Sequence, residues 1–378
     1  MVKEAATIKA TVPVLSEHGN TITKVFYKNM LTAHPELNDI FNTANQINGH
    51  QPRALAGSLY AYADNIDDLG KLSPAVELIC NKHASLYIRP EHYNIVGTLT
   101  SEIHDAWAAA YWQLANLMTQ REDQLYKAAD GWTDWRDLRI ARKVPESAEI
   151  TSFYFEPVDG NPCPARQYSL SDAPWPDYYR ISVKREKGLD IHDPEDAGHP
   201  GYVSNVLHDA KKVGDVIQVS HPFGDFFLDP EEKTDAPVVL ISAGVGLTCL
   251  LSIFNTLVAR KSERPIVWIH AAKSTKSRAF EKHVRNVVRA RDNVHAVFFT
   301  RNVGEDEVQG KDYDFQGRMD LDKLDKERDL FVTNREAQYF VCGPTNFMLD
   351  MKAKLESFGV DESRLKLELY GTGGVPKR

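Results

Sequence analysis

The sequence predicts a multidomain protein with an all-α domain, a small β domain and then a doubly wound α/β domain. Up to about Asp130, apolar residues recur at helical spacing. From about Ile150, short β-rich segments follow one another. From Ala236, apolar strands alternate with helical stretches, which is typical of a parallel sheet. A chain of 378 residues has room for two or three such domains. We place them at 1–130, 131–235 and 236–378.

The composition describes an ordinary globular protein and excludes several classes. A net charge of -8 and the lack of a long basic run argue against nucleic-acid binding. No apolar run is long enough to cross a membrane, and we expect no signal peptide. The four scattered cysteines (Cys80, Cys163, Cys249, Cys342) form no CxxC pair, so neither a zinc site nor a disulfide framework is indicated. We expect a cytoplasmic monomer, with a mitochondrial pool left open.

Five apolar-periodic segments make up the predicted helical domain. They lie at Val12–Leu15, Ile22–Leu31, Leu55–Ile66, Val76–Leu86 and Trp107–Tyr126. Ser73 is expected to cap the fourth segment, and Pro90 is expected to end it.

Seven strands are predicted after the helices, and the first three belong to the β domain. These three are Ile150–Glu156, Tyr178–Lys184 and Val216–Ser220. The α/β domain holds the other four, at Val238–Ser242, Ile266–Ile269, Ala296–Phe299 and Tyr339–Cys342.

His83 is the most informative residue of the helical domain. Val76, Ile79 and Cys80 lead to it at helical spacing, so its imidazole points the same way as a buried stripe. Such an imidazole is either a core histidine with a hydrogen-bonded nitrogen or a metal or haem ligand. Taken alone, this residue leaves both interpretations open.

Glu122 is a candidate partner for His83. It follows four apolar residues of the last helical segment by steps of three or four, which places it on their face. A buried carboxylate needs a partner, and a ligating histidine needs an acceptor for its other ring N–H. Tyr93, which comes shortly after Pro90, could complete a triad. The alternative is that Glu122 lies at the helix edge.

A second polar set lies earlier in the chain. Tyr27 lies in the apolar stretch from Val25 to Met30, and Gln51 shares a helix face with Leu55. Phe41 lies in the connection between them. A buried phenol and an amide above a vacant iron position would polarise a bound diatomic ligand. Core packing of Tyr27 and a solvated helix end at Gln51 remain the alternatives.

The motifs that contain these residues have a common resemblance. They are Phe26-Tyr27-Lys28-Asn29-Met30, Ile40-Phe41-Asn42, the segment 48–55, Lys82-His83 and Pro90-Glu91-His92-Tyr93. Together they closely resemble the globin domain of flavohaemoglobins, and the resemblance extends over nearly the whole chain.

This resemblance implies roles for the helical residues. His83 would be the proximal ligand of haem b, flanked by Lys82, with Tyr93 and Glu122 as its relay partners. The distal side would hold Tyr27 and Gln51 as the polar pair, Leu55 closing over the ligand and Phe41 packing against the haem.

The glycine-containing turn that follows the strand at Val238–Ser242 is a candidate nicotinamide site. Gly244 and Gly246 lie between that strand and a predicted helix, where they would let the backbone approach a dinucleotide. A lone GxG fits a plain tight turn equally well. Cys342-Gly343-Pro344, after another strand, strengthens the nicotinamide interpretation. The predicted NAD(P)-binding residues are Gly244, Val245, Gly246, Leu247, Thr248, Cys249, Cys342, Gly343 and Pro344.

The β domain resembles the FAD-binding antiparallel β-barrel of ferredoxin-reductase-like flavoproteins. Arg166-Gln167-Tyr168-Ser169 is similar to their RxYS motif, in which an arginine pairs with the flavin pyrophosphate. The segment from Gly201 to His208 is similar to their phosphate-facing helix start. The resemblance implies that FAD is bound by Arg166, Gln167, Tyr168, Ser169, Gly201, Val203, Ser204, Asn205, Glu368, Leu369, Tyr370, Gly371 and Thr372.

The chain departs from the flavohaemoglobin pattern in three places. Cys249 stands where the family usually has proline. The family has a further helical stretch where Gly97 passes directly into Thr98, and further barrel strands in the interval 161–166. These are two apparent internal deletions. Because a lost barrel strand leaves backbone groups unpaired, we predict severely weakened FAD binding.

The resemblance implies a nitric oxide dioxygenase that converts NO and O2 to nitrate with NAD(P)H, FAD and haem b. The alternatives are an O2- or NO-binding globin with an inactive reductase, and an NAD(P)H diaphorase with an empty globin. Lys273, Lys276 and Arg278 follow the second α/β strand, where a 2′-phosphate could bind, although a solvated charged loop is the simpler interpretation.

Overall fold

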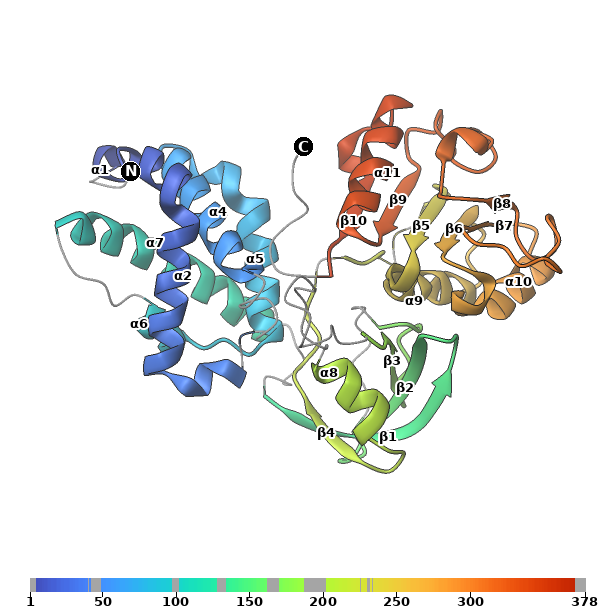
Figure 1. The fold of residues 1–378 in the computed structure, drawn as a ribbon, viewed down its shortest axis with the longest axis horizontal. Helices are drawn as coiled ribbons and strands as arrows, with labels where there is room; N and C mark the ends of the chain where they lie inside the picture. Colours follow the sequence, from blue (N-terminus) through green and yellow to red (C-terminus); the bar gives the residue numbers. More distant parts are fainter. Residues whose placement is uncertain are drawn as a thin grey trace.

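The protein is described by a computed structural model (Figure 1). It covers residues 5–39, 41, 49–96, 102–127, 134–161, 170–186, 202–224, 226–229, 232 and 234–370.

The chain begins with a helical layer. Its helices are α1 (Ala5–Lys9), α2 (Val12–Ala33), α4 (His50–Asp64), α5 (Ser73–Ser85), α6 (Pro90–Val96) and α7 (Glu102–Lys127). Helix α2 packs against α4, and α5 packs against α7 (Figure 1). The two segments predicted at 12–15 and 22–31 are parts of the single helix α2. No helix among these and the other described segments is long and apolar enough to span a bilayer.

The termini of α5 and α6 differ from the sequence prediction. Ser73 is the first residue of α5 and not its N-cap, which is Leu72 without a side-chain cap. A proline suits the first turn of a helix because the N–H groups there have no acceptor within the helix, so no hydrogen bond is lost when proline lacks its N–H. Pro74 takes such a position in α5, and Pro90 begins α6. The predicted cap at Ser73 was therefore wrong.

The first sheet (sheet A) is antiparallel and has the described strand order β3-β2-β1-β4. Its strands are β1 (Arg136–Pro145), β2 (Ile150–Pro157), β3 (Tyr179–Lys184) and β4 (Val216–Val219). Leu138, Ile140 and Phe153 lie at the centre of its core. Because β3 and β4 are edges, the described part is an open half-barrel. The interval 162–169, which holds the predicted deletion, lies outside the described residues.

The second sheet (sheet B) is parallel with the order β10-β9-β5-β6-β7-β8. Helices α9 (Leu247–Ala259), α10 (Glu281–Ala290) and α11 (Thr345–Ser357) flank it (Figure 1). The strands are β5 (Val238–Ala243), β6 (Ile266–Ala272), β7 (Val294–Thr300), β8 (Phe315–Gln316), β9 (Gln338–Cys342) and β10 (Leu365–Glu368).

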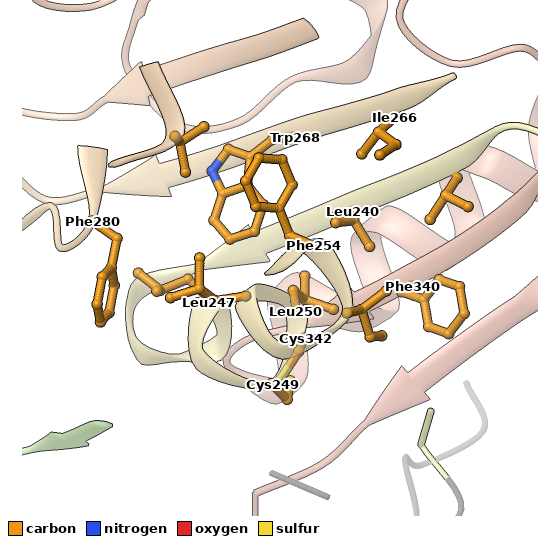
Figure 2. Close-up of a cluster of buried hydrophobic side chains, with 14 of the residues drawn as sticks. Leu240, Leu247, Cys249, Leu250, Phe254, Ile266, Trp268, Phe280, Phe340 and Cys342 are labelled. Carbon is orange, nitrogen blue, oxygen red and sulfur yellow. The ribbon is translucent and has the colours of Figure 1, made fainter. Parts of the chain in front are cut away.

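Sheet B has a large apolar core on its α9 side. Phe254 of α9 packs edge-to-face on Trp268 of β6, with ring centroids 5.4 Å apart (Figure 2). Strand β5 lies between β6 and β9. The strands that follow β5 first add to the sheet on its β6 side, and β9 and β10 later add on its other side, so the strand order reverses at β5. Ligands of doubly wound sheets bind at the carboxyl ends of the strands at such a reversal. The fold therefore directs attention to the turns after β5 and β9.

Direct contacts join the three parts of the chain. The Ser220 hydroxyl donates a 2.6 Å hydrogen bond to the backbone carbonyl of Ser85 at the end of α5. Asp172, which precedes β3, accepts a 2.7 Å hydrogen bond from the Asn255 amide of α9. The predicted domain boundaries at 130 and 235 fall between α7 and β1 and between β4 and β5, and they stay predictions.

Candidate functional site

Three polar side chains from three helices meet at His83. The His83 Nδ1 atom lies 2.9 Å from the Tyr93 hydroxyl and 3.0 Å from Glu122 Oε1. The Tyr93 hydroxyl donates a 2.6 Å hydrogen bond to the same carboxylate oxygen. Helices α5, α6 and α7 supply one residue each, so the packing of these helices fixes the cluster. The structure thus brings together the three residues that the sequence grouped.

The hydrogen-bond pattern determines the form of the imidazole. The Tyr93 proton points to Glu122, and a carboxylate can only accept, so Nδ1 of His83 must donate. A neutral imidazole with its proton on Nδ1 keeps its lone pair on Nε2. Nε2 has no hydrogen bond to any of the residues that the structure describes. A lone pair held in this way is suited to ligate a metal.

Burial keeps the supporting groups in place. The Glu122 side chain is 2% exposed, whereas His83 is 31% exposed, so the cluster opens toward one side through the imidazole. Burial, more than the neighbouring Glu122 charge, raises the pKa of Tyr93 far above its usual value. Its phenol therefore remains a donor at every physiological pH.

Two residues support this cluster that the sequence had not assigned to it. The Tyr111 hydroxyl donates a 2.6 Å hydrogen bond to the Tyr93 carbonyl. The buried Cys80 belongs to the same apolar cluster as Tyr93, and burial raises the pKa of its thiol to about 12. Tyr111 lies eleven residues before Glu122, which is three helical turns on one face, so the spacing was a usable signal. Lys82 is half-buried and precedes His83 in α5.

The predicted distal residues also gather in one place. Tyr27 of α2 is buried, and its ring packs edge-to-face on Phe41 at 5.5 Å between centroids. Leu55 of α4 belongs to the same cluster. Burial raises the pKa of the Tyr27 phenol, while its hydrogen bond with the Gln51 side chain acts in the opposite direction. The phenol and the amide are therefore partners, as the resemblance implied.

Local contacts fix the helix that carries Gln51 and Leu55. Gly49 caps α4 in the left-handed region at φ 73°, which glycine adopts without strain. The buried Thr23 hydroxyl of α2 donates a 2.8 Å hydrogen bond to the carbonyl of Pro52. These contacts hold the beginning of α4 against α2 beside Tyr27.

The turn after β5 lies against the turn after β9. A Cβ atom on Gly246 would lie 2.3 Å from the carbonyl oxygen of Cys342 and 2.7 Å from the nitrogen of Gly343. No side chain fits there, so the close approach of the two backbones requires glycine. The structure thus juxtaposes the two halves of the predicted nicotinamide site. Val245 is half-buried, Pro344 is exposed at the start of α11, and Leu247 is buried in the core.

Tyr370 lies over this pair of turns. Its hydroxyl lies 2.9 Å from the Thr248 hydroxyl, and the residue as a whole is 43% exposed. The Cys249 thiol donates to the Gly246 carbonyl at 3.5 Å. Figure 2 draws Cys249 close to Cys342 at the start of α9. The chain end predicted for the flavin and the turn predicted for the nicotinamide therefore share one location.

The remaining predicted flavin residues lie in two separate places, at sheet B and in helix α8, or fall outside the described residues. Glu368 pairs in register with Cys342, and Leu369 packs against the core of sheet B. Ser204 and Asn205 lie in the short helix α8 (Tyr202–Asn205) and bond the backbone of Glu186 at 3.3 and 3.0 Å. Val203 in the same helix is largely exposed. Arg166, Gln167, Tyr168, Ser169, Gly201, Gly371 and Thr372 lie outside the described residues.

Two family models match the chain. The model described as Globin matches residues 24–118, which include the His83 cluster and the distal residues. The model described as Oxidoreductase NAD-binding domain matches residues 240–353, which include the turns after β5 and β9.

Full-length relatives share this arrangement. The chain is 44% identical to the Flavohemoprotein of Bordetella parapertussis, with 98% of each chain covered. The crystal structure of a flavohemoglobin from Malassezia yamatoensis with bound FAD and heme is similar at a TM-score of 0.79, with 28% identity and 98% and 99% of the two chains covered. The FAD/NAD binding domain of nitric oxide dioxygenase from Vibrio cholerae matches 63% of this chain and 99% of that domain, with a TM-score of 0.53 and 30% identity.

The length of one full-length match bears on the predicted deletions. The comparison with the Bordetella parapertussis protein extends over 410 positions, more than the 378 residues of this chain. It must therefore leave gaps in this chain. The sequence predicts that gaps lie near 97 and at 161–166, and these positions stay predictions.

Proposed function

Because the chain belongs to the flavohaemoprotein family, we propose that it is a nitric oxide dioxygenase, which converts NO and O2 to nitrate. The chain is an NAD(P)H-dependent oxidoreductase of that family. The proposed cofactors are haem b, FAD and NAD(P)H, as in the Malassezia protein with its FAD and heme. The related Vibrio domain, which belongs to a nitric oxide dioxygenase, supports the reaction. A cytoplasmic, monomeric protein remains part of this proposal.

The His83 cluster is the observation that carries the proposal. Its Nδ1 is held at 2.9 and 3.0 Å by a phenol and a carboxylate, and its Nε2 has no other described partner. This donor set fits a haem iron, for which one neutral imidazole nitrogen is the usual protein ligand. When bound, the haem would supply the iron at which O2 is made reactive toward NO.

Glu122 determines how strongly the imidazole donates. Its carboxylate accepts a hydrogen bond from the Nδ1–H group of His83 and thereby raises the basicity of Nε2. The carboxylate is 2% exposed, so water does not screen this interaction. Tyr93 orients the same oxygen by donating to it at 2.6 Å. In this proposal the pair holds the ring in one tautomer and one orientation.

Tyr27 and Gln51 are the polar pair that we propose would meet a small ligand of the haem. The phenol is buried and keeps its proton, so it can donate a hydrogen bond to a small ligand. The Gln51 amide orients that phenol through their hydrogen bond. Leu55 and Phe41 surround the pair with apolar surface and would exclude water.

The nicotinamide is proposed to bind over the turns after β5 and β9. Gly244 in the turn after β5 is exposed, with open space where a side chain would stand, so its backbone would let the ligand approach. Tyr370 and Thr248 would orient the reacting ring edge, since their hydroxyls meet at 2.9 Å beside Cys249. Glu368 next to Cys342 is the proposed acid nearest this place.

A globin with an inactive reductase is the second candidate. Gaps relative to the Bordetella parapertussis protein favour it, because the predicted deletion would remove strands from the flavin half-barrel. Under this candidate the helical half binds its ligand and NAD(P)H is not consumed.

The purified full chain discriminates between these functions. Its visible absorption spectrum and its flavin content after desalting are measured first. NO consumption in aerobic buffer is then followed with NADH and with NADPH. The proposal expects a Soret band and pyridine-nucleotide-dependent NO loss, slowed in Tyr27→Phe. A Soret band without such NO loss would establish the second candidate, whereas dye reduction without a Soret band would leave only a diaphorase.

A further inference from the structure

A cavity of about 770 Å³ lies beside α10, away from the residues predicted to bind nicotinamide. Its wall comes from α10, from Arg278 and Phe280 before that helix, from Lys311 and Asp312, and from Glu146 after β1. None of the residues from Gly244 to Cys249 or from Cys342 to Pro344 lines it. Of the candidate site residues named from the sequence it contains only Arg278, which we considered for a 2′-phosphate.

Cationic side chains dominate the cavity wall. Five arginine and lysine side chains line it against three carboxyl groups, although the whole chain carries a net charge of -8. On α10, Lys282, Arg285 and Arg289 follow one another by three and four residues and share one helix face. A concentration of positive charge in an acidic protein attracts anions.

The three carboxyl groups are already engaged. Glu281 Oε1 lies 2.7 Å from both Arg278 Nη1 and Arg285 Nε. Asp312 accepts a 2.9 Å hydrogen bond from the Val308 N–H, and Glu146 hydrogen-bonds Ser152. With five cations against three carboxyl groups, part of the positive charge of the wall stays uncompensated.

Three cationic side chains in the wall lack an anionic partner, and the two arginines that pair with Glu281 each keep one nitrogen without a partner among the described residues. Lys282 and Lys311 are exposed and form no ion pair with any of the described residues, and Arg289 donates only to the neutral Asn286 oxygen at 3.2 Å. Arg278 Nε and Arg285 Nη2 are buried and have no hydrogen-bond partner among the described groups. The Arg278 side chain is 0% exposed. Buried donors without a partner indicate a missing acceptor, such as a bound anion.

We propose that this cavity binds a small molecule that carries phosphate groups. Guanidinium and ammonium groups together recognise phosphate oxygens, arginine through paired N–H donors and lysine as a point charge. The volume of about 770 Å³ is within the range of small-molecule sites and exceeds the need of a single phosphate ion. The proposal is independent of NO chemistry.

The test uses inorganic pyrophosphate and the full chain in isothermal titration calorimetry at low salt. We expect saturable binding that weakens at higher ionic strength. The double variant Lys282→Glu/Lys311→Glu reverses the charge of two of the three wall cations that have no ion pair, and it should weaken binding at least about tenfold. The matched control Lys261→Glu/Lys323→Glu makes the same charge change at exposed lysines outside the cavity and should leave binding within about twofold.

Two nicotinamide dinucleotides distinguish the sources of the phosphate. If NADP⁺ displaces pyrophosphate and NAD⁺ does not, the phosphate is the 2′-phosphate of a dinucleotide. If neither displaces it, the site takes a separate phosphorylated molecule. The proposal would be overturned by the absence of saturable binding, or by equal loss of binding in the cavity variant and the control variant.

Discussion

The helical half and the sheet B half build their sites from different parts of the chain. At His83 the site is made of side chains, which three helices bring to within 3.0 Å of one another. At Gly246 the site is made of backbone, where two turns approach so closely that a Cβ atom would lie 2.3 Å from a carbonyl oxygen. The first site is damaged by removing a polar atom, and the second by adding a carbon atom.

The largest effect is expected where an atom is added. Gly246→Ala would force the turn after β5 away from Cys342, because the new Cβ would overlap its carbonyl. We expect NAD(P)H oxidation to fall at least about a hundredfold in kcat/KM, while the Soret band of the helical half is unchanged.

Gly57→Ala is the matched control for this prediction. Gly57 lies in α4 with no heavy atom within 4 Å of its added Cβ, so the same substitution costs nothing sterically there. Near-normal NAD(P)H oxidation in Gly246→Ala would show that the two turns do not need their close approach.

The next largest effect is expected from removing a charge. Glu122→Gln keeps the shape of the side chain but replaces the charged acceptor of the His83 Nδ1 proton. Because such supporting groups typically contribute 10- to 100-fold, we expect haem affinity to fall by about that factor. Glu77→Gln is the control, since Glu77 pairs with Arg121 at the surface of the same helix pair. Equal haem affinity in the two variants would contradict a supporting role for Glu122.

A buried histidine in sheet B predicts how the stability of that half depends on pH. In sheet B, burial lowers the pKa of His270 to about 3, while Ser242 holds its Nδ1 at 2.9 Å. A lowered folded-state pKa means that the unfolded chain takes up the proton first. Stability is therefore fully present above about pH 6.5 and is lost as pH falls toward 3, by up to about 1.4 kcal/mol per pH unit.

Urea unfolding at several pH values, read from hydrogen exchange in β5 and β6 peptides, measures this loss. His270→Gln carries no titrating ring and should flatten the dependence between pH 6.5 and 3. An unchanged slope in that variant would mean that other groups cause the loss.

The smallest effect is expected from Tyr93→Phe. The substitution removes one hydrogen bond to Glu122, but the carbonyl that Tyr111 contacts remains. We expect a loss of about 1 kcal/mol in haem binding, which is a several-fold change in the dissociation constant. An effect as large as that of Glu122→Gln would mean that the phenol, and not the carboxylate, is the main partner of His83.

The sequence predicted the side-chain site better than the backbone site. His83 and Glu122 could be found because a polar residue on an apolar helix stripe is conspicuous, and Tyr93 because it follows a proline. The close approach at Gly246 depends on how two distant turns pack, which spacing along one strand does not encode. The contact between Thr248 and Tyr370 joins residues 122 positions apart and was not predicted.

Three of the ten described strands were not predicted, namely β1, β8 and β10 (Leu365–Glu368). Strand β1 (Arg136–Pro145) is rich in arginine, and only two of its residues, Leu138 and Ile140, are buried, which gives a weak alternating pattern. Strand β8 has only two residues. The single helix α2 was predicted as two segments because its exposed middle interrupts the apolar pattern.

The most direct test of the account is whether the Nε2 atom of His83 is the axial ligand. His83→Gly is purified, haem is added, and the absorption spectrum is recorded without and with free imidazole. The account predicts that haem affinity falls and axial coordination changes in the variant, and that free imidazole restores the wild-type spectrum. A variant that binds haem as tightly as the wild type, with the same spectrum and no response to imidazole, would contradict it.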